Sequence, residues 1–115
     1  MKESNELRKI IGSRLALARQ RAGLSQAQVA KELNIPRPSV SEIEAGNRKV
    51  SVEEMLGFAD LYEVDMDWLS GKDADEVDLV RDRLQLAARQ VANLKTEDLD
   101  KVIDLLTSLK MKDKK

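Results

Sequence analysis

The sequence of 115 residues contains no cysteine and no histidine, and it has only one Trp, one Tyr and one Phe. Without cysteine the chain has no disulfide and no thiolate metal site, and without histidine it lacks the most frequent acid–base catalyst and metal ligand. No Gly-rich phosphate loop or nucleophile elbow accompanies its 21 acidic residues. We therefore expect that the protein is not an enzyme and that it holds no metal and no cofactor.

Long apolar runs are also missing, which argues against a membrane protein. No stretch of 18 apolar residues occurs, and the N-terminus carries Lys2, Glu3 and Glu6 instead of a basic region leading into an apolar one. Hydrophobic residues make up 42% and charged residues 36%, with few glycines and prolines, as in soluble helical proteins. We expect a cytoplasmic, all-α protein with one globular unit and an extension.

The net charge of −1 conceals a segregation of charge along the chain. Residues 1–50 contain ten Lys or Arg against five Glu, whereas residues 51–71 contain six acidic residues and no basic one. Residues 72–115 carry ten of each sign. A basic first half beside an acidic segment gives an oriented field, which can steer a polyanion to one face of the protein.

Two helices are predicted in the first 34 residues. Apolar residues recur at helical spacing at Leu7, Ile11, Leu15 and Ala18. This pattern predicts a helix over residues 5–22, and Gly23 follows it as a left-handed stop. Ser25 and Gln28 form a capping box that opens a second helix, and Asn34 suits its left-handed end because Asn tolerates positive φ.

A third helix should follow after a short turn. Pro36 and Pro38 cannot lie inside a helix but fit its first turn, so we expect the helix to begin near Arg37 and to end before Gly46. The interval from Ser25 to Gly46 thus has the dimensions of two short helices joined by about four residues, which are those of a helix-turn-helix.

Two more helices complete the predicted first domain, which we place at residues 1–71. Ser51 and Glu54 form a second capping box for a helix that runs to Tyr62, and residues 64–69 form a short fifth helix that Gly71 stops. A charged link over residues 72–76 opens a second region, 72–115, which is a helical extension with a solvated, disordered basic tail from Lys110.

The segment SQAQVAKELNIPRPSVSEIEAGNRKVS, with VDMDWLSG behind it, closely resembles the XRE family of helix-turn-helix regulators, which includes the lambdoid phage repressors. The resemblance covers about residues 7–71 and depends on many residues in the same order. They are Arg19, Gly23 to Gln26, Ala30, Ile35, Ser39, Ile43, Glu44, Gly46 and Asp67 to Leu69. The resemblance implies a five-helix, lambda-repressor-like fold and a two-fold dimer, in which the third helix enters the major groove of double-stranded DNA.

Four residues of the third predicted helix are candidates for base contacts. Arg37, Ser39 and Glu42 project from its first two turns away from the predicted core, and Pro38 lies between them. Arg37 has the donors to read guanine O6 and N7, Glu42 can accept from a cytosine amino group, and Pro38 offers only apolar contact. The alternative is that these side chains form an ordinary solvated face.

Phosphate contacts are expected at the start of the second helix and in the loop after the third. Ser25 and Gln26 lie where free backbone N–H groups favour an anion, and the resemblance implies that Gln26 clamps the DNA backbone. The alternative for Gln26 is that it only fills the capping turn. Arg48 and Lys49 lie in the loop that the family places along the phosphates. Lys9, Arg14 and Lys31 are further cations of undecided orientation.

Two matched residues have a structural role by the same resemblance. In similar repressors, the residues that correspond to Arg19 and Glu44 form a largely internal ion pair between the first and third helices. We therefore interpret Arg19 as structural first and as a phosphate contact second. Trp68 is expected in the core rather than as a stacking platform, because it lies between Met66 and Leu69 in a short helix.

Apolar residues at spacings of three and four predict a coiled coil or helical hairpin in the extension. The dimerisation candidates are Val77, Val80, Leu84, Val91, Leu94, Leu99, Val102, Leu106 and Leu109. Thr96 is expected to cap the last helix. A homodimer with two recognition helices one DNA turn apart, and hence an inverted-repeat operator, is the simplest reading. The alternative is that both helices fold back on the first domain.

The main functional hypothesis is a dimeric repressor that binds double-stranded DNA. The alternative is an antitoxin or adaptor whose main ligand is a protein partner at the extension, with DNA binding limited to autoregulation. The segments VSEIEAGNRKVS and DLYEVDMDWL are similar to regulators that accompany metallopeptidases able to cleave them.

Overall fold

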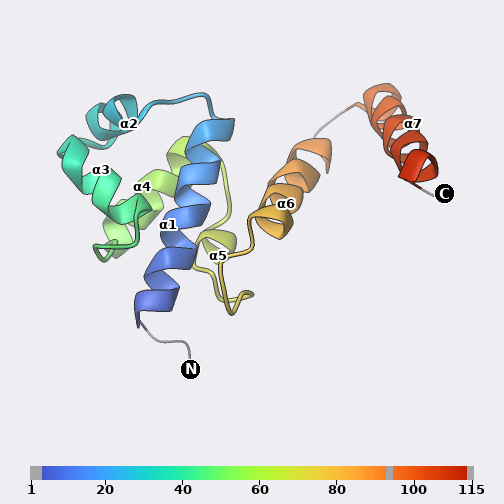
Figure 1. The fold of residues 1–115 in the computed structure, drawn as a ribbon. Helices are drawn as coiled ribbons and strands as arrows, with labels where there is room; N and C mark the ends of the chain where they lie inside the picture. Colours follow the sequence, from blue (N-terminus) through green and yellow to red (C-terminus); the bar gives the residue numbers. More distant parts are fainter. Residues whose placement is uncertain (1–3, 93–94, 114–115) are drawn as a thin grey trace. The chain divides into compact units, whose positions relative to one another are not determined.

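The computed structural model describes residues 4–92 and 95–113, and within these ranges the chain forms seven helices and no strand (Figure 1). The helices are α1 (Ser4–Arg21), α2 (Gln26–Leu33), α3 (Arg37–Glu44), α4 (Val52–Tyr62), α5 (Met66–Leu69), α6 (Leu79–Ala92) and α7 (Thr96–Asp113). Within these ranges, no helix combines the length and the hydropathy that a membrane span requires. The predicted all-α class is confirmed for the residues that the structure describes.

The chain divides into two compact units, one up to Asp82 and one from Arg83 onward. The sequence-based boundary after Gly71 therefore lies earlier than the boundary found in the structure. The first unit includes the link over residues 72–76 and the first turn of α6.

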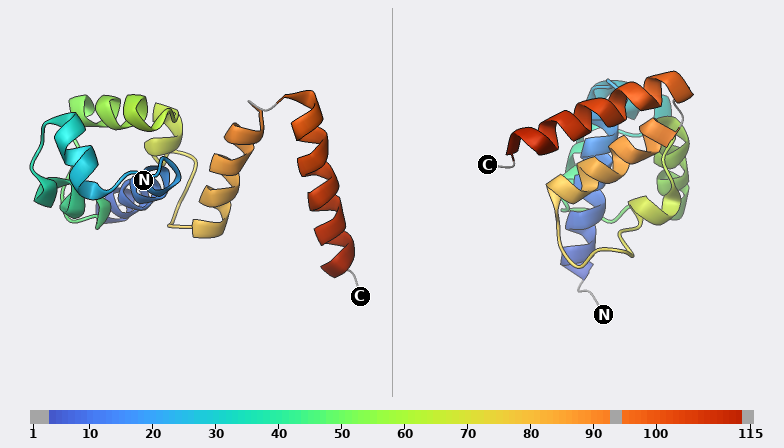
Figure 2. Two further views of the ribbon diagram at one scale, coloured as in Figure 1. Left: turned by 90° about the horizontal axis from the view of Figure 1, so that it is seen from above. Right: turned by 90° about the vertical axis from the view of Figure 1, so that its right-hand side faces the viewer.

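The first unit is built around α1. This helix contacts α3, α4 and α5, while α2 packs against α3 and α4 (Figure 1). The left view of Figure 2 shows α1 to α5, in blue to yellow, gathered in one group. The core residues come from all five helices and include Leu15, Ala18, Val29, Ala30, Val40, Ile43, Met55, Phe58, Ala59, Tyr62 and Leu69. Burial of these side chains is the main free energy that holds the short helices α2 and α3 in place.

The helix ends follow the predicted capping chemistry. Both capping boxes are complete: the Ser25 hydroxyl accepts from the Gln28 N–H at 3.1 Å, and the Ser51 hydroxyl accepts from the Glu54 N–H at 3.1 Å. Asn34 ends α2 with φ 55°, as predicted, and α3 begins at Arg37. Glu63, however, also has positive φ (54°) at the end of α4. Nothing in its residue type announces this, because an acidic side chain with a Cβ disfavours that region.

Three predicted boundaries shift by a few residues. The short helix α5 begins at Met66 rather than at Val64, because Asp65 has extended backbone and serves as its N-cap. Val77 lies outside α6, since Asp78 caps that helix by accepting from the Arg81 N–H at 3.0 Å. Thr96 is the first residue of α7 rather than the residue before it, because the Lys95 carbonyl accepts the first helical hydrogen bond from Leu99.

Arg14 is a fully buried residue of the first unit, which corrects its inclusion among the cations available to DNA. Its guanidinium donates to Asp73 Oδ1 at 2.7 Å, lies 3.0 Å from Asp82 Oδ1 and donates to the Trp68 carbonyl. It also lies 5.0 Å from the centre of the Trp68 ring. Burial alone lowers the pKa of Arg14, but the hydrogen bonds and charges of the two carboxylates outweigh it and raise the pKa. This ion cluster explains why the first unit continues to Asp82.

A glycine in the middle of α1 sets its distance from α3. A Cβ built on Gly12 would lie 2.5 Å from the Ile43 carbonyl oxygen and 2.6 Å from that of Glu44. Both neighbours are backbone atoms, which cannot rotate away as a side chain can. The close approach of α1 to the end of α3 therefore requires glycine at this position.

The apolar stripe of the extension remains largely uncovered. Leu84 is 65% exposed, Leu106 58% and Leu109 50%, and Val80 is 70% exposed. Val91, Leu99 and Val102 are half-buried, and Leu94 lies outside the described residues. Helix α7 continues to Asp113, through the first four residues of the stretch expected to be a tail.

Candidate nucleic-acid interface

The turn between α2 and α3 fixes the geometry of the two-helix motif. Asn34 turns the chain with left-handed backbone, and the Ile35 N–H returns to the Ala30 carbonyl at 3.0 Å. Pro36 then enters α3 with extended backbone, and Pro38 occupies the first turn, where the absence of an N–H costs nothing. Buried Val40 and Ile43 hold one face of α3 against the core. The opposite face is therefore presented to solvent.

A shallow groove of about 320 Å³ lies between the beginnings of α2 and α3. Its walls are Gln26 on α2 and Arg37, Pro38, Ser41 and Glu42 on α3. The structure thus brings three of the four candidate base-contact residues next to the candidate phosphate clamp. Arg37, Pro38 and Glu42 are exposed, while Gln26 is half-buried.

Ser41, and not the predicted Ser39, lies on the groove side of α3. Ser39 is half-buried and does not line the groove, whereas exposed Ser41 does. Sequence reasoning overlooked Ser41, although helical periodicity contains the signal. Ser41 is four residues after Arg37 and therefore shares its face, while Ser39 stands four residues before buried Ile43.

Arg19, Glu44 and Gln26 form a hydrogen-bonded network behind the groove. Arg19 donates to both carboxylate oxygens of Glu44, at 2.8 and 3.1 Å, and its side chain also donates to the Leu24 carbonyl at 2.9 Å. The side chains of Arg19 and Glu44 are only 15% and 8% exposed. The hydrogen bond to Glu44 raises the pKa of Arg19, so the Arg19 guanidinium keeps its charge.

Gln26 is attached to the same carboxylate. Its Nε2 donates to Glu44 Oε1 at 3.0 Å, which fixes the amide at the edge of the groove. Ser25, by contrast, is committed to the capping box, where its N–H donates to Gln28 Oε1 at 2.7 Å and its hydroxyl accepts from Gln28. Gln26 at the start of α2 is therefore oriented by Glu44 of α3, which Arg19 of α1 holds in turn.

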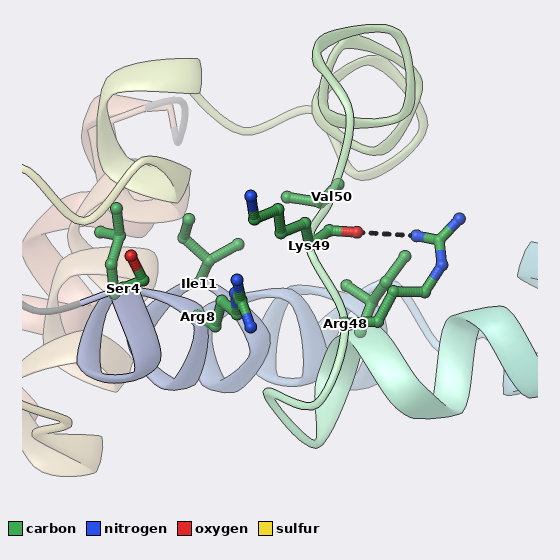
Figure 3. A pocket seen from close by; sticks show the side chains of 8 residues that line it. Ser4, Arg8, Ile11, Arg48, Lys49 and Val50 are labelled. Atoms are coloured by element: carbon green, nitrogen blue, oxygen red, sulfur yellow. Dashed lines mark hydrogen bonds between the residues drawn. The ribbon is translucent and has the colours of Figure 1, made fainter.

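In the loop after α3, one cation is paired and the other is not. Arg48 donates to both oxygens of Glu54, at 2.9 and 3.0 Å. It also donates to the Lys49 carbonyl at 2.9 Å, as Figure 3 shows. The Arg48 guanidinium and the Ser51 backbone lower the pKa of Glu54 to about 2. Within residues 4–92 and 95–113, Lys49 has no ion pair, and neither have Arg37 and Glu42. Arg37 and Glu42 at the groove and Lys49 in the loop are thus unpaired charges among the residues that the structure describes.

Helix α3 is exposed on one face, carries hydrogen-bond donors around its first turn and lies beside the positive N-terminal end of α2. This arrangement has the shape and chemistry to enter a DNA groove and bind the adjacent phosphates. Side chains that can donate to or accept from base edges occupy the outer face of α3. Behind this face, the charges of Arg19 and Glu44 neutralise each other. The fold and the site together define a DNA-binding protein of the helix-turn-helix class.

Comparison with known proteins agrees with this class. Residues 10–69 match the family model described as "Helix-turn-helix domain". The HTH-type transcriptional regulator ImmR of Bacillus subtilis (strain 168) is 36% identical over 92 residues, which cover 76% of this chain and 70% of that protein. The chain therefore belongs to the helix-turn-helix family of XRE-like transcription regulators, and it is a DNA-binding regulator.

Solved structures show the same fold. The restriction-modification controller protein C.AhdI from Aeromonas hydrophila is 31% identical with a TM-score of 0.51, and the match covers 54% of this chain and 94% of that one. The clp gene regulator ClgR from Corynebacterium glutamicum is 22% identical, with a TM-score of 0.52 and coverage of 86% and 92%. A chain of the SinR protein/SinI protein complex is 17% identical, with a TM-score of 0.54 and coverage of 88% and 98%.

Proposed function

We propose that the protein is a dimeric transcriptional repressor that reads an inverted-repeat operator through α3. The observation that carries this proposal is the groove between Gln26 and the outer face of α3, where Arg37 and Glu42 are exposed and unpaired within the described residues. Arg37 contacts a guanine, Glu42 or Ser41 contacts a neighbouring base, and Gln26 holds a phosphate.

Lys49 supplies the second backbone contact. Because Arg48 is occupied by Glu54, we assign Arg48 to holding the loop and assign Lys49 to the phosphate. Each phosphate that is neutralised contributes about 0.9 to the slope of log K against log salt. Lys49 is therefore the residue whose loss should reduce the salt dependence most directly.

The exposed stripes of α6 and α7 support a homodimer. Leu84, Leu106 and Leu109 are exposed within the second unit, and a second copy is the partner that a repeated apolar stripe fits best. A two-fold dimer places two α3 helices on one side of the duplex, and occupation of such a site excludes other proteins from the same DNA.

The function is tested by fluorescence anisotropy with DNA from upstream of the gene, a scrambled duplex as control, and a series of salt concentrations. The proposal expects tight binding of two chains per duplex, a clear preference for the natural sequence and a steep salt dependence. Binding no stronger than that of the scrambled duplex would contradict it and would favour a protein partner as the main ligand.

Two substitutions separate base reading from backbone binding. Arg37→Ala should lower affinity for the operator by about 1–3 kcal/mol and relax the preference at one guanine. Lys49→Ala should weaken binding to all sequences alike and reduce the salt slope by about 1. Lys101→Ala, a change of the same charge on α7, is the matched control and should leave both quantities unchanged. Equal losses on every sequence for both Arg37→Ala and Lys49→Ala would refute the base-reading role.

A further inference from the structure

A second cavity lies beside the proposed DNA face, between the start of α1 and the loop after α3 (Figure 3). Figure 3 shows Arg8 and Ile11 rising from α1 toward the loop segment that carries Lys49 and Val50. Leu7, Ile11, Ile43 and Val50 provide aliphatic walls, and the cavity volume is about 190 Å³. All of these residues belong to the first unit.

The rim of the cavity is positively charged. Arg8 and Lys49 both line it, and within the described residues neither forms an ion pair. No acidic side chain is among the described residues that line it, and the nearby carboxylate of Glu54 is bound by Arg48. Apolar walls with two unpaired cations match a ligand that has an apolar body and a single negative end.

The volume limits the size of that ligand. A cavity of about 150 Å³ with apolar walls is large enough for benzene. A pocket of about 190 Å³ therefore accommodates an apolar body slightly larger than benzene.

We propose that this pocket binds a small organic carboxylate with an apolar body of about five to eight carbons, and that its binding weakens the DNA complex. The second part rests on the proposed function, because it requires Lys49 to hold a phosphate. A carboxylate in the pocket neutralises Lys49 and so competes with that phosphate. By thermodynamic linkage, DNA lowers the affinity for the carboxylate by the same factor.

The pocket is tested without DNA by titration of the full-length, ¹⁵N-labelled protein, followed by NMR. The probes are hexanoate, acetate and hexan-1-ol, which carry the apolar body and charge together, the charge alone and the body alone. Amide shifts should centre on residues 7–11 and 48–50. Hexanoate should bind at least about tenfold more tightly than acetate, since it buries four more carbon atoms.

A matched pair of variants tests the charge. Arg8→Gln should weaken hexanoate binding by about fivefold or more, through the loss of a charge-assisted hydrogen bond. Arg83→Gln, the same change in the second unit, should leave it unaltered. Equal affinity for hexanoate and acetate, no shifts near Ile11 and Val50, or equal effects of the two variants would overturn the site.

The regulatory part is tested by DNA anisotropy in hexanoate against acetate at equal concentration and ionic strength. Hexanoate should weaken DNA binding and acetate should not. If hexanoate binds in the NMR titration and DNA affinity stays constant, the competition is overturned and the site stands. If the protein binds no DNA even in acetate, the proposed function fails, while the NMR titration still decides the site.

Discussion

The carboxylate of Glu44 connects three helices of the DNA-binding unit, α1, α2 and α3. It accepts two hydrogen bonds from Arg19 and one from Gln26, and its side chain is only 8% exposed. A buried ion pair contributes little net stability compared with apolar residues of the same shape, but removal of one partner leaves an unpaired charge. Loss of one partner of the ion pair should therefore reduce stability more than replacement of both partners by apolar residues.

Arg19→Met should consequently lower the free energy of unfolding by about 3 kcal/mol, because Glu44 loses its counter-charge at a site of low exposure. The double variant Arg19→Met with Glu44→Leu should be less destabilised than the sum of the two single variants. Urea denaturation followed by circular dichroism measures all four proteins of this cycle. Additive effects within about 0.5 kcal/mol would show that the pair is not coupled.

A second residue-scale prediction concerns pH. The pKa of Glu54 is lowered from 4.5 to about 2 in the folded protein. Its contribution to stability is therefore fully present above pH 4.5 and is lost as the pH falls toward 2, where the folded protein must also take up the proton.

Glu54→Gln should flatten the fall in melting temperature between pH 4.5 and pH 2. Glu53→Gln is the matched control, since Glu53 lies in the same first turn of α4 and is exposed. Thermal melts at a series of pH values make the comparison. The same pH dependence in both variants would mean that the effect belongs to the helix terminus and not to the Arg48 ion pair.

Among the elements, the contact of α1 with α3 depends on one missing side chain. Gly12→Ala places a methyl group within 2.6 Å of two backbone oxygens of α3. We expect a loss of about 3 kcal/mol, despite the higher helix propensity of Ala, because backbone atoms must move apart.

Gly57→Ala provides the contrast for this prediction. The added Cβ meets the end of the flexible Leu33 side chain at 3.1 Å, so the strain and the gain in helix propensity should nearly cancel. Chemical denaturation of the two variants checks the difference. A similar stability of both would show that α1 and α3 separate at little cost.

Local sequence patterns predicted the helix ends well, but they could not predict contacts between residues that are far apart in the sequence. The capping boxes at Ser25 and Ser51 and the turn at Asn34 are encoded by neighbouring residues, so they could be read directly. The burial of Arg14 could not, because its partners Asp73 and Asp82 lie 59 and 68 residues further along the chain. The pairing of Arg48 with Glu54 was likewise invisible, since either side chain alone looks like a solvated charge.

At the scale of the whole molecule, the extension is the region whose exposed apolar side chains most favour binding of a partner. Its exposed leucines lie on both α6 and α7, and each would release water from apolar surface on association. The sequence predicted the stripe from its spacing. It could not decide between a second copy and the first domain, because both would bury the same residues.

Leu106→Glu should therefore weaken the proposed dimer at least a hundredfold, since both copies lose a buried leucine worth roughly 1.5–3 kcal/mol each. DNA binding should then become weaker and lose its stoichiometry of two chains. Ser108→Glu, a nearby exposed position on α7, controls for the added charge. Sedimentation equilibrium of the purified proteins measures the change. A wild-type chain that sediments as a monomer at every concentration would contradict the dimer outright.

The shared carboxylate of Glu44 also bears on how such a regulator can evolve. One group joins α1 to α3 and orients Gln26, so a change there alters the fold and the proposed DNA face in the same step. The fold does not depend in the same way on the exposed residues that line the groove, Arg37, Ser41 and Glu42. Substitutions at these outer positions can therefore change the proposed operator preference alone, whereas a substitution at Glu44 also disturbs the packing of α1 on α3.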